Sequence, residues 1–287
     1  MSITTAAGAG THVGRIRQHN EDSYCAAHPV FVVADGMGGH RAGDVASAAV
    51  IQCFSALGGL SAVRPATVLA ALGSANERIL ELIGHDGELA GMGTTCVGLV
   101  LLGDAVAPRW LAFNVGDSRL YLFAEGLLQR ISIDHSEVQE MIDAGEISEE
   151  QARSHPRRHI VTRALGSDPV PLVDVWEMPA LGGQRWLLCS DGLTGEVSED
   201  VITGVLAGVP HPGSTAQRLV ALALEAGGHD NITAVVVDVV EIEDVGAADD
   251  TASNEDWANS PDDTLPSGAD VPPGPQDRGH SGEGRQE

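Results

Sequence analysis

Residues 31–40 of this 287-residue chain read FVVADGMGGH, and a second stretch, WLLCSDG at residues 186–192, has a similar pattern. In each, a short apolar run predicts a buried strand that ends close to one carboxylate, Asp35 or Asp191. The glycines that follow predict a turn in which the backbone comes close to whatever the carboxylate binds. Either Asp-Gly pair alone is equally typical of a simple hairpin turn.

The composition predicts a globular cytoplasmic protein. Hydrophobic residues make up 43% of the chain, and no apolar run approaches the roughly 18 residues that a membrane span requires. The N-terminus lacks the basic and apolar segments of a signal peptide. The formal net charge of −25 disfavours nucleic acid as a partner, because phosphate backbones are bound by basic surfaces. Four cysteines without metal-site spacing favour reduced thiols: Cys25, Cys53, Cys96 and Cys189.

Residues 244–287 differ from the rest of the chain. They contain 11 acidic and 2 basic side chains together with five prolines, and few residues that could form a core. This composition predicts a disordered, acidic tail. The preceding residues, 3–243, are predicted to form one domain.

The pattern within 3–243 predicts antiparallel sheet covered by helices. Apolar residues recur at helical spacing over 41–57 and 65–83, and a capping-box match at Ser214 predicts a helix that runs to Gly227. Because strands and helices come in groups rather than in alternation, the fold class is predicted to be α+β. Strand-like runs, of which the first four are typical of an antiparallel meander, are expected at 93–102, 110–115, 118–123, 128–133, 170–176, 184–189 and 232–237.

Acidic residues stand at the ends of the predicted strands or in the turns beside them. Carboxylates at the mouths of buried strands repel one another, so they need arginine partners, protonation or cations. Few arginines lie close to them in sequence, Arg17 among them, which favours cations. Oxygen ligands without His or Cys spacing select Mg²⁺ or Mn²⁺, and the Gly36 carbonyl is a further candidate ligand. The acidic set comprises Glu21, Asp22, Asp35, Asp117, Asp191 and Asp230.

Such a site is suited to the hydrolysis of a phosphate ester. Two ions roughly 3.5–4 Å apart lower the pKa of a shared water and neutralise phosphoryl oxygens. Arg17 would hold the non-reacting phosphoryl oxygens with its forked guanidinium. The sequence presents no Ser/His/Asp or Cys/His arrangement, which predicts direct attack by metal-bound water without a covalent intermediate.

Seven short motifs appear in an order that is found in one enzyme family. They are Arg17…Glu21-Asp22, Asp35-Gly36-Met37-Gly38-Gly39-His40, Gly93-Thr94-Thr95, Gly116-Asp117-Ser118-Arg119, Asp134-His135-Ser136, Ser190-Asp191-Gly192 and His229-Asp230-Asn231-Ile232-Thr233. With them the chain resembles the metal-dependent (type 2C) serine/threonine protein phosphatases, and most of all their bacterial branch, over residues 8–240. The resemblance implies a type 2C-like catalytic domain at 3–243, built as a four-layer α-β-β-α sandwich with two central antiparallel sheets flanked by helices.

The resemblance also implies which residues bind two or three Mn²⁺ or Mg²⁺ ions. Asp35 would bridge two metals, with the Gly36 carbonyl on one of them. Asp191 and Asp230 would bind the first metal. Glu21 would serve the second metal, directly or through water.

Further roles follow from the same resemblance. Asp117 would join Asp191 at a third metal, and Asn231 would support the ligands around it. Arg17 would bind the substrate phosphate, and Asp22 would orient metal-bound water.

One position departs from the pattern of many eukaryotic members. They place a histidine directly after the Asp-Gly pair, where it is taken to protonate the leaving oxygen, and this chain has Met37 there. His40 comes three residues later, and the general acid stays unassigned. Residues 136–166, hereafter the flap, correspond to the variable segment beside the active site of the family.

The sequence thus predicts a cytoplasmic signalling hydrolase. It would dephosphorylate phosphoserine and phosphothreonine by attack of a metal-bridging water, in opposition to a bacterial serine/threonine protein kinase. Its partners would be phosphorylated proteins, the kinase and the kinase's substrates among them, and neither nucleic acid nor membrane. Two alternatives stay open: a pseudophosphatase that binds phosphoproteins without turnover, which the intact ligand set disfavours, and a phosphoesterase for small molecules.

Overall fold

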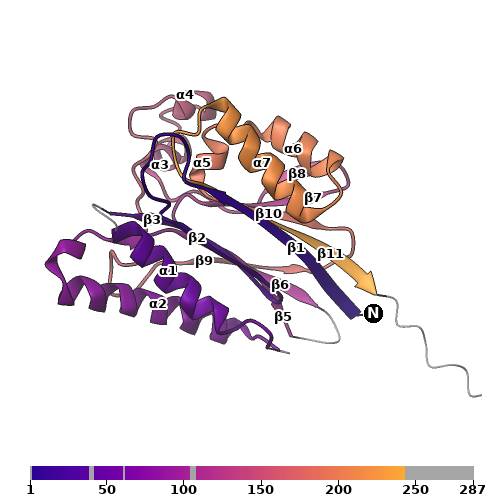
Figure 1. Ribbon diagram of the computed structural model, residues 1–287, viewed down its shortest axis with the longest axis horizontal. Helices are drawn as coiled ribbons and strands as arrows, with labels where there is room; N and C mark the ends of the chain where they lie inside the picture. Colours follow the sequence, from indigo (N-terminus) through magenta and orange to yellow (C-terminus); the bar gives the residue numbers. More distant parts are fainter. Residues whose placement is uncertain (1, 39–41, 61, 104–107, 243–287) are drawn as a thin grey trace, which may run out of the picture. The chain divides into compact units, whose positions relative to one another are not determined.

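Two antiparallel sheets lie at the centre of the fold, and helices cover the outer face of each (Figure 1). The computed structural model describes residues 2–38, 42–60, 62–103 and 108–242. His40 and the predicted tail at 244–287 lie outside these residues. The predicted domain boundaries stay a prediction.

The strands form two sheets. Within each sheet, every pair of neighbouring strands is antiparallel. The first sheet contains β1 (Ser2–His12), β7 (Arg119–Ala124), β8 (Leu127–Arg130), β10 (Arg185–Cys189) and β11 (Ile232–Ile242) in the order β1-β11-β10-β7-β8. The second contains β2 (Asp22–Ala27), β3 (Val30–Met37), β5 (Cys96–Leu102), β6 (Arg109–Val115) and β9 (Asp174–Pro179) in the order β2-β3-β5-β6-β9, with β4 (Gly93–Thr94) beside β3.

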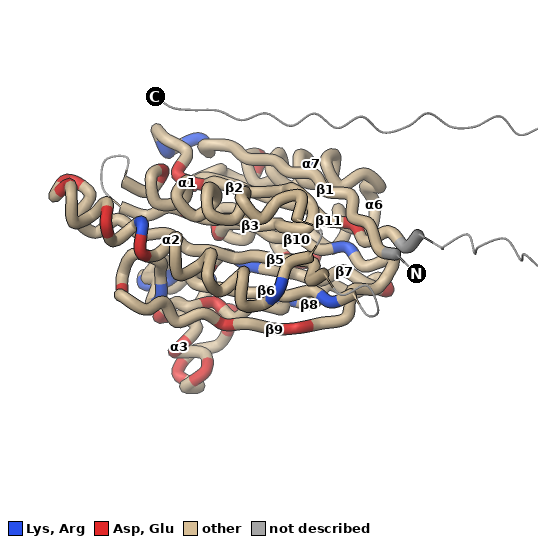
Figure 2. The backbone as a smooth tube through the Cα atoms, turned by 90° about the horizontal axis from the view of Figure 1, so that it is seen from below, with Lys and Arg blue, Asp and Glu red and all other residues tan. Residues whose placement is uncertain are grey.

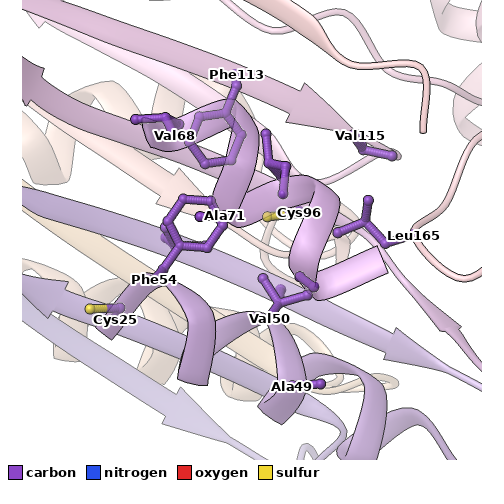
Figure 3. Packing of buried hydrophobic residues seen from close by; sticks show 14 of the residues in the cluster. Cys25, Ala49, Val50, Phe54, Val68, Ala71, Cys96, Phe113, Val115 and Leu165 are labelled. Atoms are coloured by element: carbon purple, nitrogen blue, oxygen red, sulfur yellow. The ribbon is translucent and has the colours of Figure 1, made fainter. Parts of the chain in front are cut away.

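Three apolar layers hold the sheets and helices together. The helices are α1 (Ala42–Ser55), α2 (Pro65–His85), the 3-10 turn η1 (Gly87–Leu89), α3 (Glu137–Asp143), α4 (Glu149–Arg153), α5 (Asp191–Thr194), α6 (Glu199–Gly208) and α7 (Pro212–Ala226). Between α1, α2 and the second sheet, the rings of Phe54 and Phe113 stack with centroids 5.2 Å apart (Figure 3). Trp110 and Trp186 pack edge to face between the sheets, and a third layer lies under α5–α7. The predicted α+β, four-layer α-β-β-α sandwich is confirmed.

The meander predicted over residues 93–133 is divided between the two sheets. β5 and β6 pair in the second sheet, whereas β7 and β8 pair in the first. Gly116, whose φ is 105°, and Asp117 lie in the connection that crosses from one sheet to the other. Trp110 and Leu120 then both pack between the sheets. The alternation of apolar residues is the same for this arrangement as for a single meander, so the sequence pattern could not separate them.

Two element boundaries also differ from expectation. α7 begins at Pro212, and Ser214 forms no capping box. Proline suits the first turn of a helix because the N–H that it lacks would have no partner there. The hydroxyl of Thr215 donates to the His211 carbonyl at 2.9 Å, back toward the start of the helix. The strand expected at 170–176 lies at β9 instead.

Acidic positions outnumber basic ones on the fold, and Figure 2 shows a group of them at α3. Glu137, Glu140 and Asp143 belong to that helix. None of the helices in the described residues combines the length and the apolarity that crossing a bilayer requires.

Candidate metal centre

The predicted acidic residues lie at the same end of the two sheets. Asp22 and Asp35 are opposite each other in the β2–β3 pair. Asp191 begins α5 directly after β10, and Asp230 comes shortly before β11, which is antiparallel to β10. Asp117 lies in the β6–β7 connection. Because the neighbouring strands are antiparallel, the end of one strand and the start of the next meet at this edge.

Asp35 is held through its backbone by the motif at residues 93–95. The Thr95 hydroxyl accepts a hydrogen bond from the Asp35 N–H at 3.0 Å. The Thr94 hydroxyl and the Thr95 N–H both donate to the Asp35 carbonyl at 2.9 Å. These bonds fix the end of β3, and they leave the Asp35 carboxylate without a hydrogen bond to any other described residue.

Residues 13–21, hereafter the arm, pack against β3 and α1 by close backbone contact. The Gly36 N–H donates to the Glu21 carbonyl at 3.1 Å, and the Ser47 hydroxyl donates to the same carbonyl at 2.6 Å. A Cβ at position 36 would lie 2.0 Å from the Gly43 carbonyl oxygen. Glycine is therefore required where the arm, β3 and α1 meet.

Asp22 is buried and holds one oxygen without a partner. The Ser190 hydroxyl donates to Asp22 Oδ2 at 2.7 Å and accepts from the Thr233 N–H at 2.9 Å. Asp22 Oδ1 is buried and has no hydrogen-bond partner among the described residues. Burial raises the pKa of the Asp22 carboxyl to about 7, and the nearby carboxylates of Asp191 and Asp230 add to the shift.

Asn231 ties the arm to β11. Its Oδ1 accepts from the Glu21 N–H at 2.8 Å, and its Nδ2 donates to the carbonyls of Val13 and His19 at 2.9 Å each. The residue is 4% exposed, so these bonds are made away from water. Asn231 thereby fixes the position of the arm, which also carries Arg17.

The carboxylates are only partly neutralised by protein charges. Burial raises the pKa values of Asp35 and Asp117 well above their ordinary range, and neighbouring carboxylates, Asp191 among them, raise them further. Arg17 Nη2 lies 2.7 Å from Asp230 Oδ2. Cations would stabilise the charged form of this group of acids. The candidate donors are all oxygen atoms, which suits Mn²⁺ or Mg²⁺.

The oxygen donors of these acids and their burial support binding of a divalent ion, although the described side chains do not form a complete coordination site. Among the described residues, no three Asp, Glu, His or Cys side chains converge on one point. Like charges disfavour closer approach in a partly dry site. The buried Asp22 Oδ1 and the raised pKa values are the features that a bound cation would satisfy.

Some residues beside the site had no predicted role there. His159, on the flap, has its Nδ1 3.9 Å from Asp191 Oδ2. Asp134 is paired with Arg119, Nη2 to Oδ2 at 2.6 Å, and it adds to the raised pKa of Asp117, which burial and Asp191 dominate. Arg119 and Asp134 belong to the sequence motifs at 116–119 and 134–136, so the sequence could have indicated them. No sequence signal distinguishes His159 from the other exposed histidines.

Comparison with known proteins gives consistent matches. A family model described as "Protein phosphatase 2C" matches residues 9–222. The serine/threonine protein phosphatase PstP of Mycobacterium tuberculosis is 41% identical over 234 residues, which cover 79% of this chain and 44% of that protein. The serine/threonine phosphatase stp of Listeria monocytogenes is 38% identical over 244 residues, which cover 79% and 93%. The chain thus spans less than half the length of the mycobacterial relative.

Solved structures agree with these sequence matches. The crystal structure of M. tuberculosis PstP/Ppp superimposes with a TM-score of 0.78 at 38% identity, and the match covers 83% of this chain and 99% of that one. The catalytic domain of PstP in complex with two manganese ions gives a TM-score of 0.74 at 37% identity, with 84% and 100% covered.

Proposed function

The chain belongs to the protein phosphatase 2C family of metal-dependent serine/threonine phosphatases, and on this basis we propose that it hydrolyses phosphoserine and phosphothreonine in proteins. The observation that carries the proposal is the gathering of buried and half-buried carboxylates with raised pKa values beside Arg17 at one end of the sheets. The acids suit cations, and the Arg17 guanidinium suits the dianionic phosphate ester that the cations would accompany.

We assign metal binding to the acids that meet at this edge. Mn²⁺ or Mg²⁺, when bound, lowers the pKa of water and neutralises charge on phosphoryl oxygens. The mutual proximity of the acids and the manganese ions in the related PstP structure support this assignment. The groups assigned to two or three ions are Glu21, Asp35, the Gly36 carbonyl, Asp117, Asp191 and Asp230.

Two further residues would act on the substrate and on water. Arg17 commits Nη2 to Asp230, and its side chain is 52% exposed, so its other N–H groups can bind phosphoryl oxygens from solvent. Asp22 is held at Oδ2 by Ser190, which leaves Oδ1 to accept a hydrogen bond from water and orient it. Asn231 keeps the arm in place.

The partners in this proposal are phosphorylated proteins. A serine/threonine protein kinase, whose phosphorylation the enzyme would reverse, and the substrates of that kinase are the expected ones. We also place the enzyme in the cytoplasm, and its four free cysteines, three of them buried, support a reducing compartment.

The test is phosphate release from a phosphothreonine peptide with Mn²⁺, with chelator, and by the Asp191→Asn variant. We expect turnover only with metal, and a loss of at least about 1,000-fold in the variant, because metal ligation supplies several kcal/mol of charge stabilisation. Asp200→Asn, the same change at an exposed position of α6, is the control and should keep full activity. Circular dichroism of both variants checks that they fold.

The outcomes separate the proposal from its alternatives. Turnover that survives the chelator would refute the metal-dependent mechanism. A wild-type protein that binds the phosphopeptide without releasing phosphate would be a pseudophosphatase. Rates that are high with small phosphate esters and negligible with phosphopeptides would favour a small-molecule phosphoesterase.

A further inference from the structure

A cavity of about 520 Å³ lies between the flap and the segment that follows β10. Its wall includes Asp117 and Asp191, which we assign to metal binding, and it also includes Arg153 and Arg158 of the flap. A cavity of this size can enclose several groups of a ligand. The space therefore connects the candidate metal centre with basic side chains that the proposed hydrolysis does not use.

Most other acids in the cavity wall already have partners. Asp134 is paired with Arg119, Glu199 accepts from a buried tyrosine hydroxyl at 3.0 Å, and Glu196 accepts from a histidine imidazole at 2.6 Å. Glu149 is exposed at the start of α4, and its side chain has no hydrogen bond or ion pair with another described residue. Asp117 and Asp191 are assigned to cations. Glu149 is therefore the one acid of the cavity wall that has neither a partner among the described residues nor an assigned cation.

The arginines of the flap fall into two pairs. Arg157 Nη1 lies 3.2 Å from a glutamate of α3, and Arg163 Nη1 lies 2.9 Å from an aspartate of β9. The Arg153 side chain has no hydrogen bond or ion pair with any described residue. The Arg158 side chain makes one long hydrogen bond, 3.4 Å, to a nearby backbone carbonyl. The two that line the cavity are therefore the two without a carboxylate partner, in a chain with 41 acidic and 16 basic residues.

We propose that this cavity is a second anion-binding subsite, in which Arg153 and Arg158 bind a phosphate or carboxylate group of the substrate protein near the phosphoserine or phosphothreonine that is hydrolysed. The proposal rests on the proposed phosphatase function and adds a substrate class to it. Proteins that carry two neighbouring phosphates, or a phosphate in an acidic segment, are the preferred substrates.

The chemistry of the wall favours an anion on the same chain as the reacting phosphate. Guanidinium groups donate two parallel hydrogen bonds to a carboxylate or phosphate, and such charge-assisted bonds are stronger than neutral ones. The same cavity touches Asp117 and Asp191, so a second anion on the substrate chain can reach the two arginines while the reacting phosphate is at the metal centre. An anion that is not attached to the substrate would contact either the arginines or the metal centre, but not both.

The test compares kcat/KM for matched peptides. One peptide has a single phosphothreonine with neutral neighbours. Two sets carry in addition one glutamate or one phosphoserine, placed in turn at each nearby position on either side. We expect at least one acidic position to raise kcat/KM of the wild type about tenfold, the effect of one charge-assisted hydrogen bond. The double variant Arg153→Gln, Arg158→Gln should lose this gain and keep the rate on the neutral peptide.

Arg78→Gln is the matched control, because Arg78 is an exposed arginine of α2 away from the cavity wall. This variant should keep the full preference for acidic peptides. Equal preference in the double variant and the wild type, or no preference in the wild type, would overturn the subsite. A gain with phosphoserine only, or with glutamate as well, identifies which anion the subsite accepts.

A small substrate distinguishes a failure of the proposed phosphatase activity from a failure of the proposed subsite. With Mn²⁺, p-nitrophenyl phosphate reports the metal centre without occupying the subsite, and we expect equal rates for wild type and double variant. If no substrate is turned over, the same peptides are titrated calorimetrically. Tighter binding of the acidic peptide to the wild type, but not to the double variant, would still support the subsite, and equal binding would overturn it.

Discussion

The arm and the flap both border the candidate metal centre, but they are held in different ways. The arm is fixed by a buried asparagine, Asn231, and by backbone contact through Gly36. The flap contains two short helices, and its arginines Arg157 and Arg163 pair with acids at partly exposed positions. Changes in the arm should therefore disturb folding and metal binding together, whereas changes on the flap should act on the substrate.

The largest effect on stability is expected where the arm touches β3. In Gly36→Ala, the new Cβ would lie 2.0 Å from the Gly43 carbonyl oxygen, and relief of this overlap should cost about 3 kcal/mol of unfolding free energy. Urea unfolding measures it. The matched control is Gly73→Ala in α2, where a Cβ meets nothing within 4 Å and stability should rise by about 0.5–1 kcal/mol. A neutral Gly36→Ala would mean that the junction of β3, α1 and the arm is loosely packed.

A comparison of two buried asparagines distinguishes an effect of the arm on metal binding from a general loss of stability. Asn76 of α2 donates to two loop carbonyls and accepts from the Gly166 N–H, much as Asn231 binds the arm. Alanine at either position should cost about 2 kcal/mol, because buried backbone groups lose their partners. Only Asn231→Ala should also raise the Mn²⁺ concentration for half-maximal activity, by about 10–100-fold.

Activity titrated with Mn²⁺, together with urea unfolding of each variant, checks this pair. Equal shifts in metal requirement for Asn76→Ala and Asn231→Ala would show that the arm has no specific role at the metal centre.

A smaller effect is expected at the root of the flap, where His135 titrates. Burial lowers the pKa of His135, and its Nδ1 accepts from the Gly116 N–H at 3.0 Å, which the doubly protonated ring cannot do. A pKa below the unfolded value near 6.5 means that this stabilisation is present above that pH and is lost as the pH falls through the folded pKa.

Thermal unfolding between pH 7.5 and pH 5 tests the prediction. The melting temperature of the wild type should fall more steeply on acidification than that of His135→Gln. His85→Asn, a change at an exposed histidine of α2, should keep the slope of the wild type. Parallel curves for wild type and His135→Gln would contradict the lowered pKa.

The sequence predicts best what depends on local apolar runs. The runs before Asp35 and Asp191 are strongly apolar, and both strands lie where expected. β1 was not predicted, because Ser2–His12 is rich in alanine, glycine and threonine and becomes a strand through its pairing with β11. The strand ends converge through the order of strands in the sheets, so the motif residues meet although they are far apart in sequence.

Other features could be read only from the tertiary structure. The arginines of the flap look alike in sequence, yet Arg157 is paired and Arg158 lines the cavity. The approach of His159 to Asp191 brings together the flap and the start of α5, which lie far apart in sequence. These contacts are set by packing between segments that have no common sequence pattern. The roles of the individual site residues stay predictions until the variants are measured.

The smallest effect is expected on the outer surface of the flap. Arg157 Nη1 lies 3.2 Å from Glu137 Oε2, but the arginine side chain is 51% exposed. Ion pairs at partly exposed positions contribute little because water screens the arginine, so Arg157→Gln should change the unfolding free energy by less than about 1 kcal/mol. Its rate on p-nitrophenyl phosphate should also stay that of the wild type. Urea unfolding and steady-state kinetics measure both. A loss as large as that of Asn231→Ala would show that the flap is as firmly built into the fold as the arm, and the contrast between the two segments would fail.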